Sequence, residues 1–174
     1  MNKNTLQRNT GFTLIETVIY IGLFAILMGG ALTSVYAIIE GNNRNQNKAM
    51  VQEEGTFILG KIDWALTGVS SASVDAAGKI LTITKSNFPN NPIVITVNEQ
   101  LGNITIKRGI GLTQGLNNSN VRVECPPEKC FNRDLATGDG INPENISVDI
   151  LVNSRTSDGL PYSQEFSTVK FIRK

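Results

Sequence analysis

An uncharged run of 23 residues, Thr17 to Ile39, constrains this chain more than any other feature. A helix of that length is about 35 Å long, and the hydrocarbon core of a bilayer is about 30 Å thick. The run therefore predicts a membrane-spanning helix near the N-terminus. The rest of the 174-residue chain suits one small domain, and its wealth of Asn, Thr, Ser and Gly is typical of sheet-and-loop structure.

The residues before the run are arranged unlike a conventional secretory signal. A short polar leader holds two cations, Lys3 and Arg8, and is followed by Gly11-Phe12-Thr13-Leu14-Ile15-Glu16. A conventional signal is cut at small residues after its apolar region, whereas the candidate cut here, Gly11-Phe12, lies before that region. Cleavage at this point would leave the apolar segment on the mature protein.

This hexapeptide, with its basic leader and the apolar run behind it, resembles the processing site of type IV prepilins and type II secretion pseudopilins. The resemblance implies cleavage between Gly11 and Phe12 by a prepilin peptidase, and N-methylation of Phe12. It also implies a single-pass protein of the inner membrane. The positive-inside bias would hold Lys3 and Arg8 in the cytoplasm and place the domain outside it. The alternative is a plain anchor that is not cleaved.

Glu16 is the one carboxylate at the start of the apolar run. A carboxylate at the centre of a membrane helix costs about 2.5–3.5 kcal/mol, and less near an end. The resemblance implies that Glu16 serves assembly by neutralising the N-terminal amine of an adjacent subunit. Two charges in an apolar bundle offset each other's desolvation only when they are closely paired. The alternative places Glu16 at the level of the lipid headgroups, where water solvates it.

We expect one helix from Phe12 to about Thr67, whose second half packs on the domain. In that half, small and apolar residues recur at helical spacing, as on a helix that covers a sheet. They are Val51, Gly55, Ile58, Ile62, Ala65 and Val69, with Phe57 and Leu66 close to the same face. Gly68 with Ser70-Ser71 is the expected end of the helix.

Short alternating segments after residue 70 predict a small antiparallel sheet. Strands are expected at Lys79–Lys85, Pro92–Asn98 and Ile104–Lys107 as a meander, then at Val121–Glu124, and at Ile146–Val152 and Gln164–Ile172 as a hairpin. The expected fold class is α+β, a long N-terminal helix on a small antiparallel sheet, as in pilins. Its expected segments are a leader at 1–11, a membrane-spanning helix at 12–39, the extracytoplasmic half of the helix at 40–69 and a β-sheet domain at 70–174.

The chain has no histidine and only two cysteines, Cys125 and Cys130. Histidine-dependent catalysis is absent outright and a Cys/His zinc site is disfavoured, so we expect no enzyme, no cofactor and no metal site. Four residues between the cysteines permit a small structural disulfide outside the cytoplasm, whereas a redox motif has two. Many type IV pilins close a longer loop with their disulfide. The short loop therefore favours a minor over a major subunit.

The formal net charge is +1, and removal of Lys3 and Arg8 makes it −1. A nearly neutral chain argues against non-specific nucleic-acid binding, which depends on neutralising phosphates. Cations at Lys107-Arg108, Arg122 and Lys170–Lys174 leave one alternative open, a membrane-anchored, pilus-associated binding module for DNA uptake or adhesion.

Oxygen-bearing side chains crowd the region after the second cysteine: Asn132, Asp134, Asp139, Asn142 and Glu144. Such residues can bind calcium, but their spacing does not match an EF-hand, and they are common in solvated loops. No metal is assigned to them.

These features together predict a pilin-like structural subunit of a type IV pilus or a type II secretion pseudopilus. Its expected partners are the prepilin peptidase and N-methyltransferase, other pilin or pseudopilin subunits, the inner-membrane assembly platform and membrane lipid.

Overall fold

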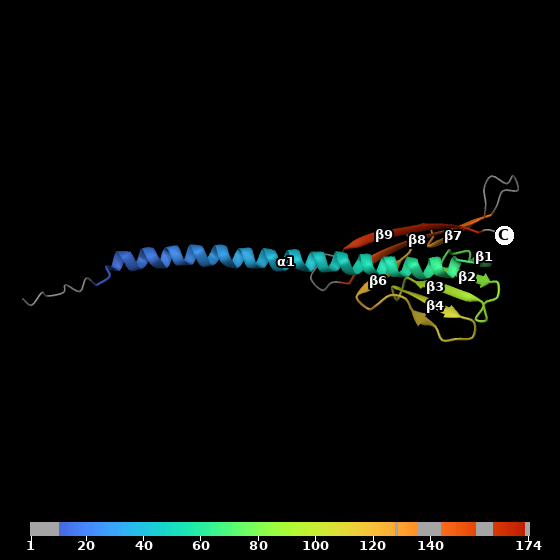
Figure 1. Ribbon diagram of the computed structural model, residues 1–174. Coiled ribbons are helices and arrows are strands. Elements are labelled where there is room, and N and C mark those ends of the chain that lie inside the picture. Colours follow the sequence, from blue (N-terminus) through green and yellow to red (C-terminus); the bar gives the residue numbers. More distant parts are fainter. Residues whose placement is uncertain (1–10, 128, 136–143, 156–161, 173–174) are drawn as a thin grey trace, which may run out of the picture. The chain divides into compact units, whose positions relative to one another are not determined.

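The computed structural model describes residues 11–127, 129–135, 144–155 and 162–172. One helix is followed by nine strands in this part of the chain (Figure 1). They are α1 (Leu14–Leu66), β1 (Val69–Val74), β2 (Ile80–Lys85), β3 (Ile93–Asn98), β4 (Asn103–Arg108), β5 (Gln114–Gly115), β6 (Val121–Glu124), β7 (Phe131–Asp134), β8 (Asn145–Ser154) and β9 (Ser163–Phe171). The chain forms two compact units that meet between Asn43 and Arg44, within α1.

The predicted long helix is confirmed, and it ends at Leu66, next to the expected end at about Thr67. Gly68 adopts a positive φ of 70°, a left-handed conformation that commonly terminates helices. Val69 was expected on the helix face, and this was wrong, because it is the first residue of β1. Val69 is still buried, so its apolar character reflects the core and not the helix.

The predicted packing face of α1 is confirmed in the second unit, where its buried residues are Val51, Gly55, Ile58, Ile62, Ala65 and Leu66. Phe57 lies outside that face and is 48% exposed. The last turn of α1 has no basic residue of its own. Lys85 of β2 supplies the cation: its Nζ donates to the carbonyl oxygen of Trp64 at 2.6 Å, where helix carbonyls lack intrahelical partners.

The first sheet contains β1 to β5 in sequence order, all antiparallel. The predicted meander of β2, β3 and β4 is confirmed. Two strands were missed. β1 has the sequence Val-Ser-Ser-Ala-Ser-Val, with fewer β-branched residues than a typical strand, and β5 has only two residues. Both form because they pair with strong neighbours, β2 and β4 respectively.

The expectation of one small sheet was wrong, because the last four strands form a second sheet around β8. One edge of β8 pairs with β9, as the predicted hairpin requires. The other edge is shared: Leu151–Ser154 pairs with β6 and Asn145–Val148 with β7. β7 was missed because Phe131 is its only apolar residue.

Alternating residues of both sheets pack with α1 in one hydrophobic core. Its larger fully buried residues include Ile58, Ile62, Leu81, Ile95, Ile104, Phe131, Ile146 and Ile150. The fold class is therefore α+β, a long N-terminal helix packed on antiparallel sheets.

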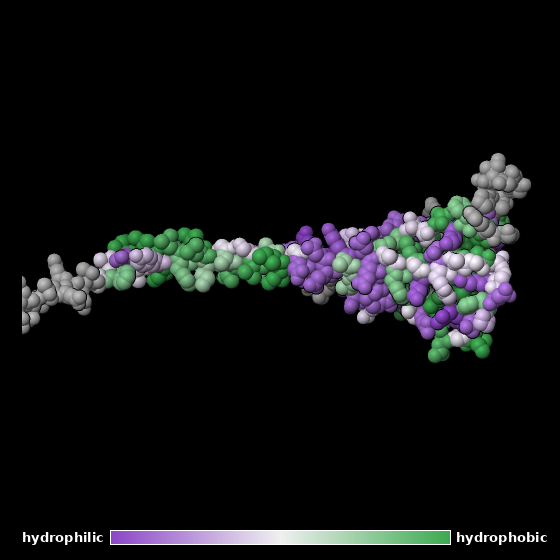
Figure 2. Space-filling view, viewed as in Figure 1, coloured by the Kyte–Doolittle hydropathy of each residue, from purple (hydrophilic) through white to green (hydrophobic). Residues whose placement is uncertain are grey.

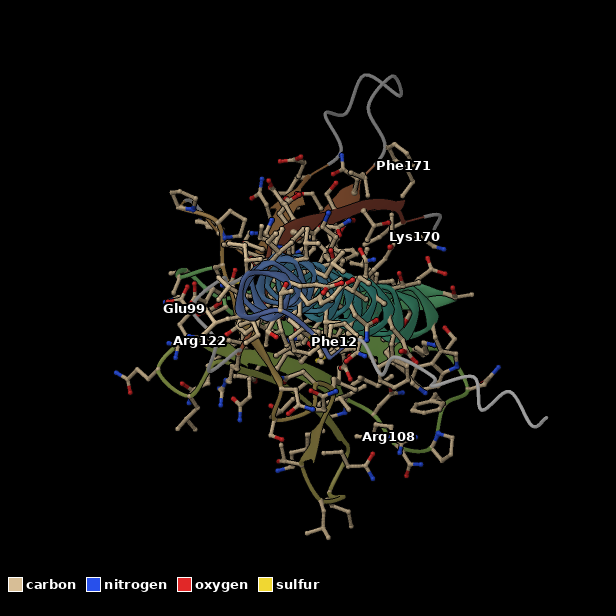
Figure 3. The ribbon with its side chains drawn as sticks, turned by 90° about the vertical axis from the view of Figure 1, so that its left-hand side faces the viewer. Phe12, Glu99, Arg108, Arg122, Lys170 and Phe171 are labelled. Carbon is tan, nitrogen blue, oxygen red and sulfur yellow. A yellow bond between two sulfur atoms is a disulfide. The ribbon has the colours of Figure 1, made fainter. Side chains whose placement is uncertain are left out.

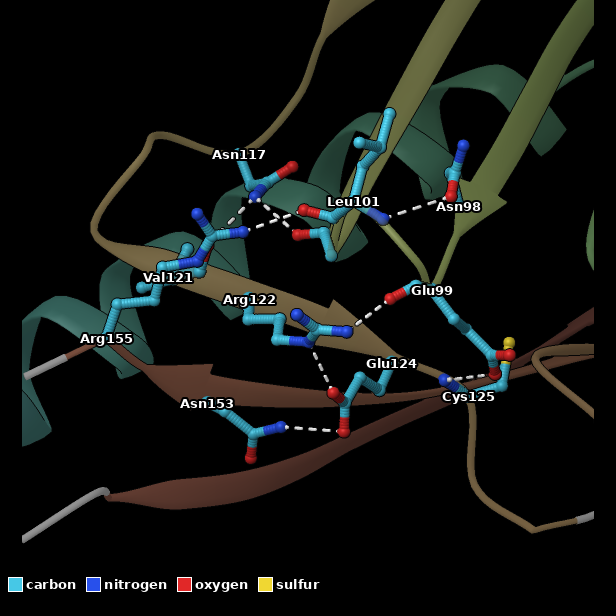
Figure 4. Close-up of polar contacts among 11 residues, drawn as sticks. Asn98, Glu99, Leu101, Asn117, Val121, Arg122, Glu124, Cys125, Asn153 and Arg155 are labelled. Atoms are coloured by element: carbon cyan, nitrogen blue, oxygen red, sulfur yellow. Dashed lines mark hydrogen bonds and ion pairs between the residues drawn. The ribbon is translucent and has the colours of Figure 1, made fainter.

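Polar contacts tie the β3–β4 turn to the second sheet (Figure 4). Arg122 of β6 donates to the backbone oxygen of Glu99 and, through Nε, to Oε1 of Glu124 at 2.5 Å. Arg155 donates to the backbone oxygen of Leu101 at 2.7 Å. Cys125 donates its backbone N–H to Oε1 of Glu99 at 3.3 Å. The turn therefore carries much of the polar connection between the sheets.

We expect Glu99→Gln to destabilise the fold modestly at neutral pH. Lys79, which pairs with Glu99, lowers the pKa of that carboxyl below its ordinary value of 4.5, and the Cys125 N–H lowers it further despite partial burial. A lowered folded-state pKa means that the stabilisation is present above the ordinary pKa and is lost as pH falls through the folded value. Both side chains are more than a third exposed, so the loss should be below about 1 kcal/mol.

Urea unfolding of wild type and Glu99→Gln, followed by the fluorescence of the single tryptophan, measures this effect. The difference should be present at neutral pH and vanish below pH 4.5 as Glu99 becomes protonated. Glu53→Gln, at an exposed position of α1, is the matched control. A difference that persisted unchanged into strong acid would contradict the assignment.

Candidate processing and assembly site

The first unit presents an apolar helix with no cover of its own among the described residues. The large apolar side chains from Phe12 to Ile39 are all at least about half exposed. α1 is the one helix in the described part of the chain that is long and apolar enough to cross a membrane. Figure 2 shows hydrophobic residues along this segment up to the start of a hydrophilic stretch.

The N-terminal end of α1 is capped by Thr13. Its Oγ1 accepts a hydrogen bond from the backbone N–H of Glu16 at 3.4 Å. Thr13 and Glu16 have the spacing of a capping box, in which the helix begins immediately after the threonine. Glu16 is thereby fixed in the first turn, where the partial positive charge of the helix terminus favours a carboxylate.

Tyr20 is a neighbour of Glu16 that the sequence prediction did not include. Its hydroxyl donates to Oε1 of Glu16 at 3.4 Å. Its ring meets the ring of Phe12 edge-on, with 6.1 Å between centroids. The spacing of four residues between Glu16 and Tyr20 was the available signal, since residues four apart are neighbours on a helix. Phe12, Glu16 and Tyr20 therefore form one cluster at the start of α1.

Gly11 lies immediately before this cluster and is exposed. A Cβ built on Gly11 would meet no atom of the described residues within 4 Å, and the φ of Gly11 is not in the left-handed region. Neither packing nor backbone conformation therefore requires glycine at this position. Lys3 and Arg8, the leader cations, lie outside the described residues.

Cys125 and Cys130 are joined by a disulfide with an S–S distance of 2.07 Å and a Cα–Cα distance of 4.7 Å. Cys130 is fully buried beside Phe131, and Cys125 packs against the core. The bond closes the turn between β6 and β7. Its position makes it part of the fold and not an exposed redox centre.

The scattered cations do not gather into one patch among the described residues. Arg122 pairs with Glu124, and Lys170 pairs with Asp63 at 2.6 Å. Figure 3 places Arg108, Arg122 and Lys170 on different sides of the second unit.

The oxygen-rich region after the second cysteine is also arranged differently from a ligand loop. Asn132 and Asp134 belong to β7, and Glu144 forms an ion pair with Nη2 of Arg133 at 2.6 Å. No group of three His, Cys, Asp or Glu side chains that could hold a metal occurs in the described part of the chain. Asp139 and Asn142 lie outside it.

A membrane-type apolar helix with one carboxylate in its first turn, continuing into an α+β domain, has the layout of pilin-like proteins. Residues 6–32 match a family model described as the prokaryotic N-terminal methylation motif, which is the signature of type IV pilins and pseudopilins. No curated protein and no solved structure matches the chain. The motif and the apolar helix support a membrane-anchored, type IV pilin-like protein, and the motif implies processing by a prepilin peptidase and association with other pilins.

Proposed function

We propose that this chain is a structural subunit of a type IV pilus or a secretion pseudopilus, and not an enzyme. The peptidase removes the leader, residues 1–11, and the new N-terminal amine of Phe12 is methylated. Residues 12–39 hold the subunit in the inner membrane and later form the filament core. Residues 40–69 continue the helix outside the cytoplasm, and 70–174 form the displayed domain. The assembly platform of the membrane moves the subunit from lipid into the filament.

The observation that carries this proposal is the position of Glu16. It is the only carboxylate at the start of an exposed apolar helix, and the cap at Thr13 holds it in the first turn. Cleavage after Gly11 creates an amine four residues before Glu16. An adjacent subunit can bring that amine to Glu16, so that both charges leave water and lipid headgroups as a pair.

The character of Gly11 supports cleavage at this bond. Because neither packing nor conformation requires glycine there, its presence is explained by recognition in the peptidase active site, which a side chain would obstruct. Before cleavage, the positive charges of Lys3 and Arg8 keep the leader on the cytoplasmic side of the membrane.

Mass spectrometry of the chain purified from its native host tests the proposal. The mature protein should begin at Phe12 and carry one methyl group on its amine. Gly11→Val should leave the full-length chain uncut in the membrane, whereas Gly41→Val, at a position that is equally open on α1, should be processed normally. A wild-type chain that keeps its leader in a host with an active prepilin peptidase would overturn the proposal.

A further inference from the structure

The loop between β4 and β5 displays two aliphatic side chains almost without cover. Ile110 is 106% exposed and Leu112 is 89% exposed, the highest values among the large hydrophobic residues that the structure describes. Isolated exposed apolar residues are ordinary on a protein surface, but two together at the tip of a loop need an explanation. Figure 2 shows hydrophobic residues at the lower edge of the second unit, below β4.

Backbone hydrogen bonds anchor the loop that carries these side chains. The N–H of Gly109 donates to the oxygen of Pro92 at 2.8 Å, and that of Gly111 donates to the oxygen of Arg108 at 2.9 Å. Gly109 has a positive φ of 53°, and a Cβ there would lie 3.3 Å from the backbone of Asn90. The backbone around Ile110 is therefore anchored to the neighbouring β2–β3 connection.

A groove between α1 and the first sheet begins beside this loop. Its volume is about 480 Å³, and its lining includes Phe57, Lys61, Trp64 and Arg108. The aromatic side chains of Phe57 and Trp64 are 48% and 42% exposed. Lys61 and Arg108 form no ion pair with a described residue, and no carboxylate lines the groove. We call Phe57, Lys61, Trp64, Arg108, Ile110 and Leu112 the groove surface.

The outer face of the second sheet has the opposite charge. The strand register places Asp149 opposite Ser167, Asn145 opposite Phe171, and Asp134 opposite Asn145, so side chains of β7, β8 and β9 share this face. Val169 and Phe171 are 54% and 57% exposed on it. We call Asp134, Asp149, Glu165, Val169 and Phe171 the carboxylate face.

Asp134, Asp149 and Glu165 form no ion pair with a described residue, whereas Glu124, on the β6 part of the same sheet face, pairs with Arg122. Asp134 accepts a hydrogen bond from the side-chain amide of Asn132 at 3.5 Å. Partial burial and the neighbouring charge of Glu165 raise the pKa of Asp149. Like charges held close together without a counter-charge are destabilising, and a cation brought to this face would relieve the repulsion.

The two surfaces lie on opposite sides of the second unit. Figure 1 shows β9 and β4 on either side of α1, and Figure 3 shows Phe171 and Arg108 pointing in opposite directions. Each surface combines exposed apolar side chains with charges of one sign that form no ion pair with a described residue, and the signs are opposite. A contact of this kind between copies is heterologous, so every bound copy leaves a free surface for the next.

We infer that the groove surface of one copy of this chain binds the carboxylate face of a second copy. Phe171 supplies an aromatic side chain for the apolar groove, while Lys61 and Arg108 meet Asp149 and Glu165. The inference deepens the proposed function and rests on it for the setting in a filament. A subunit whose copies bind one another in a row can fill a filament, as a major subunit does. This differs from the minor subunit that the short disulfide loop favoured.

Crosslinking of the full chain tests this contact. Leu112→Cys and Val169→Cys are introduced into the same chain, and cells that express it are treated with a short bismaleimide. Cys125 and Cys130 do not react because they form a disulfide. The expected product is a ladder of dimers, trimers and longer species, since each copy offers both ends of the contact. Either substitution alone should give no ladder. Leu101→Cys with Val169→Cys is the matched control, because Leu101 is also exposed but lies at the other end of β4.

Charge reversal tests the electrostatic part. Lys61→Glu with Arg108→Glu, or Asp149→Lys with Glu165→Lys, should reduce the ladder at least about tenfold, because like charges then meet across the contact. A chain with all four reversals should recover it. Tryptophan fluorescence during unfolding shows whether each variant is folded, which is expected because Lys61, Arg108 and Glu165 are exposed and Asp149 is only half-buried.

Three results would overturn the contact: a ladder equally strong in the Leu101 control, crosslinking that stops at dimers, or reversals without effect. Filaments that form without any ladder would refute the contact and leave the proposed function standing. A chain that is never processed or assembled would refute the proposed function, and crosslinking of the detergent-solubilised full chain would still test the contact.

Discussion

Cells that express Glu16→Ala are expected to cut and methylate the chain normally and to leave it in the membrane. The variant keeps Gly11, Phe12 and the apolar run, which the peptidase requires, and loses only the carboxylate of the first turn. Without it, the amine of a neighbouring Phe12 would enter the apolar core uncompensated. Removing one partner of a buried charge pair costs about 3–5 kcal/mol, so incorporation should fall more than about a hundredfold.

Sheared filaments and membranes, assayed separately for the mature chain, measure this effect. Glu16→Gln keeps the size and most of the polarity and should fail in the same way, which separates charge from packing. Glu53→Ala removes an exposed carboxylate further along α1 and should assemble normally. Normal amounts of Glu16→Ala in filaments would refute the pairing role.

The parts of the fold that the sequence predicted are those with a strong local pattern. α1 was recognised because an uncharged run continues into a face of regularly spaced small and apolar residues. β8 was recognised because Ile146, Val148, Ile150 and Val152 alternate without interruption, and all four are fully buried. Such patterns depend on residues close together in the chain, so sequence alone reveals them.

The missed parts depend on distant residues. β1 and β7 carry few apolar side chains and are strands because β2 and β8 offer free edges to them. The division into two sheets has the same origin. β6 and β7 share one edge of β8, an arrangement that no local pattern specifies.

The candidate site divides in the same way. Gly11, Phe12 and Glu16 follow each other closely, and their order within a short motif was enough to single them out. The contact between Tyr20 and Glu16 was recognised only in the structure, where the helix brings the Tyr20 hydroxyl to the carboxylate. The groove surface and the carboxylate face could not be predicted from the sequence. The residues of the first come from α1, β4 and the β4–β5 loop, and those of the second come from three strands.

The second unit holds α1 close to β9 at Gly55, and Gly55→Ala is expected to destabilise the fold. A Cβ there would lie 2.3 Å from Cε2 and Cζ of Phe166. Alanine is favoured over glycine in a helix by about 1 kcal/mol, but overpacking costs about 1–3 kcal/mol. The clash should prevail, because the ring of Phe166 projects from β9 against α1 and must move more than 1 Å to reach an ordinary contact distance of about 3.5 Å.

Gly60→Ala gives the matched control on the same helix. A Cβ on Gly60 meets no atom within 4 Å, so this variant should gain about 0.5–1 kcal/mol from helix propensity alone. The two substitutions should therefore shift the urea midpoint, followed by tryptophan fluorescence, in opposite directions. Phe166→Ala provides the decisive background. There the clash is absent, and Gly55→Ala should become stabilising, with a coupling of about 1–3 kcal/mol between the two sites. If Gly55→Ala were stabilising in the wild-type background too, α1 could move away from β9 without cost, and glycine at position 55 would need a reason other than close packing.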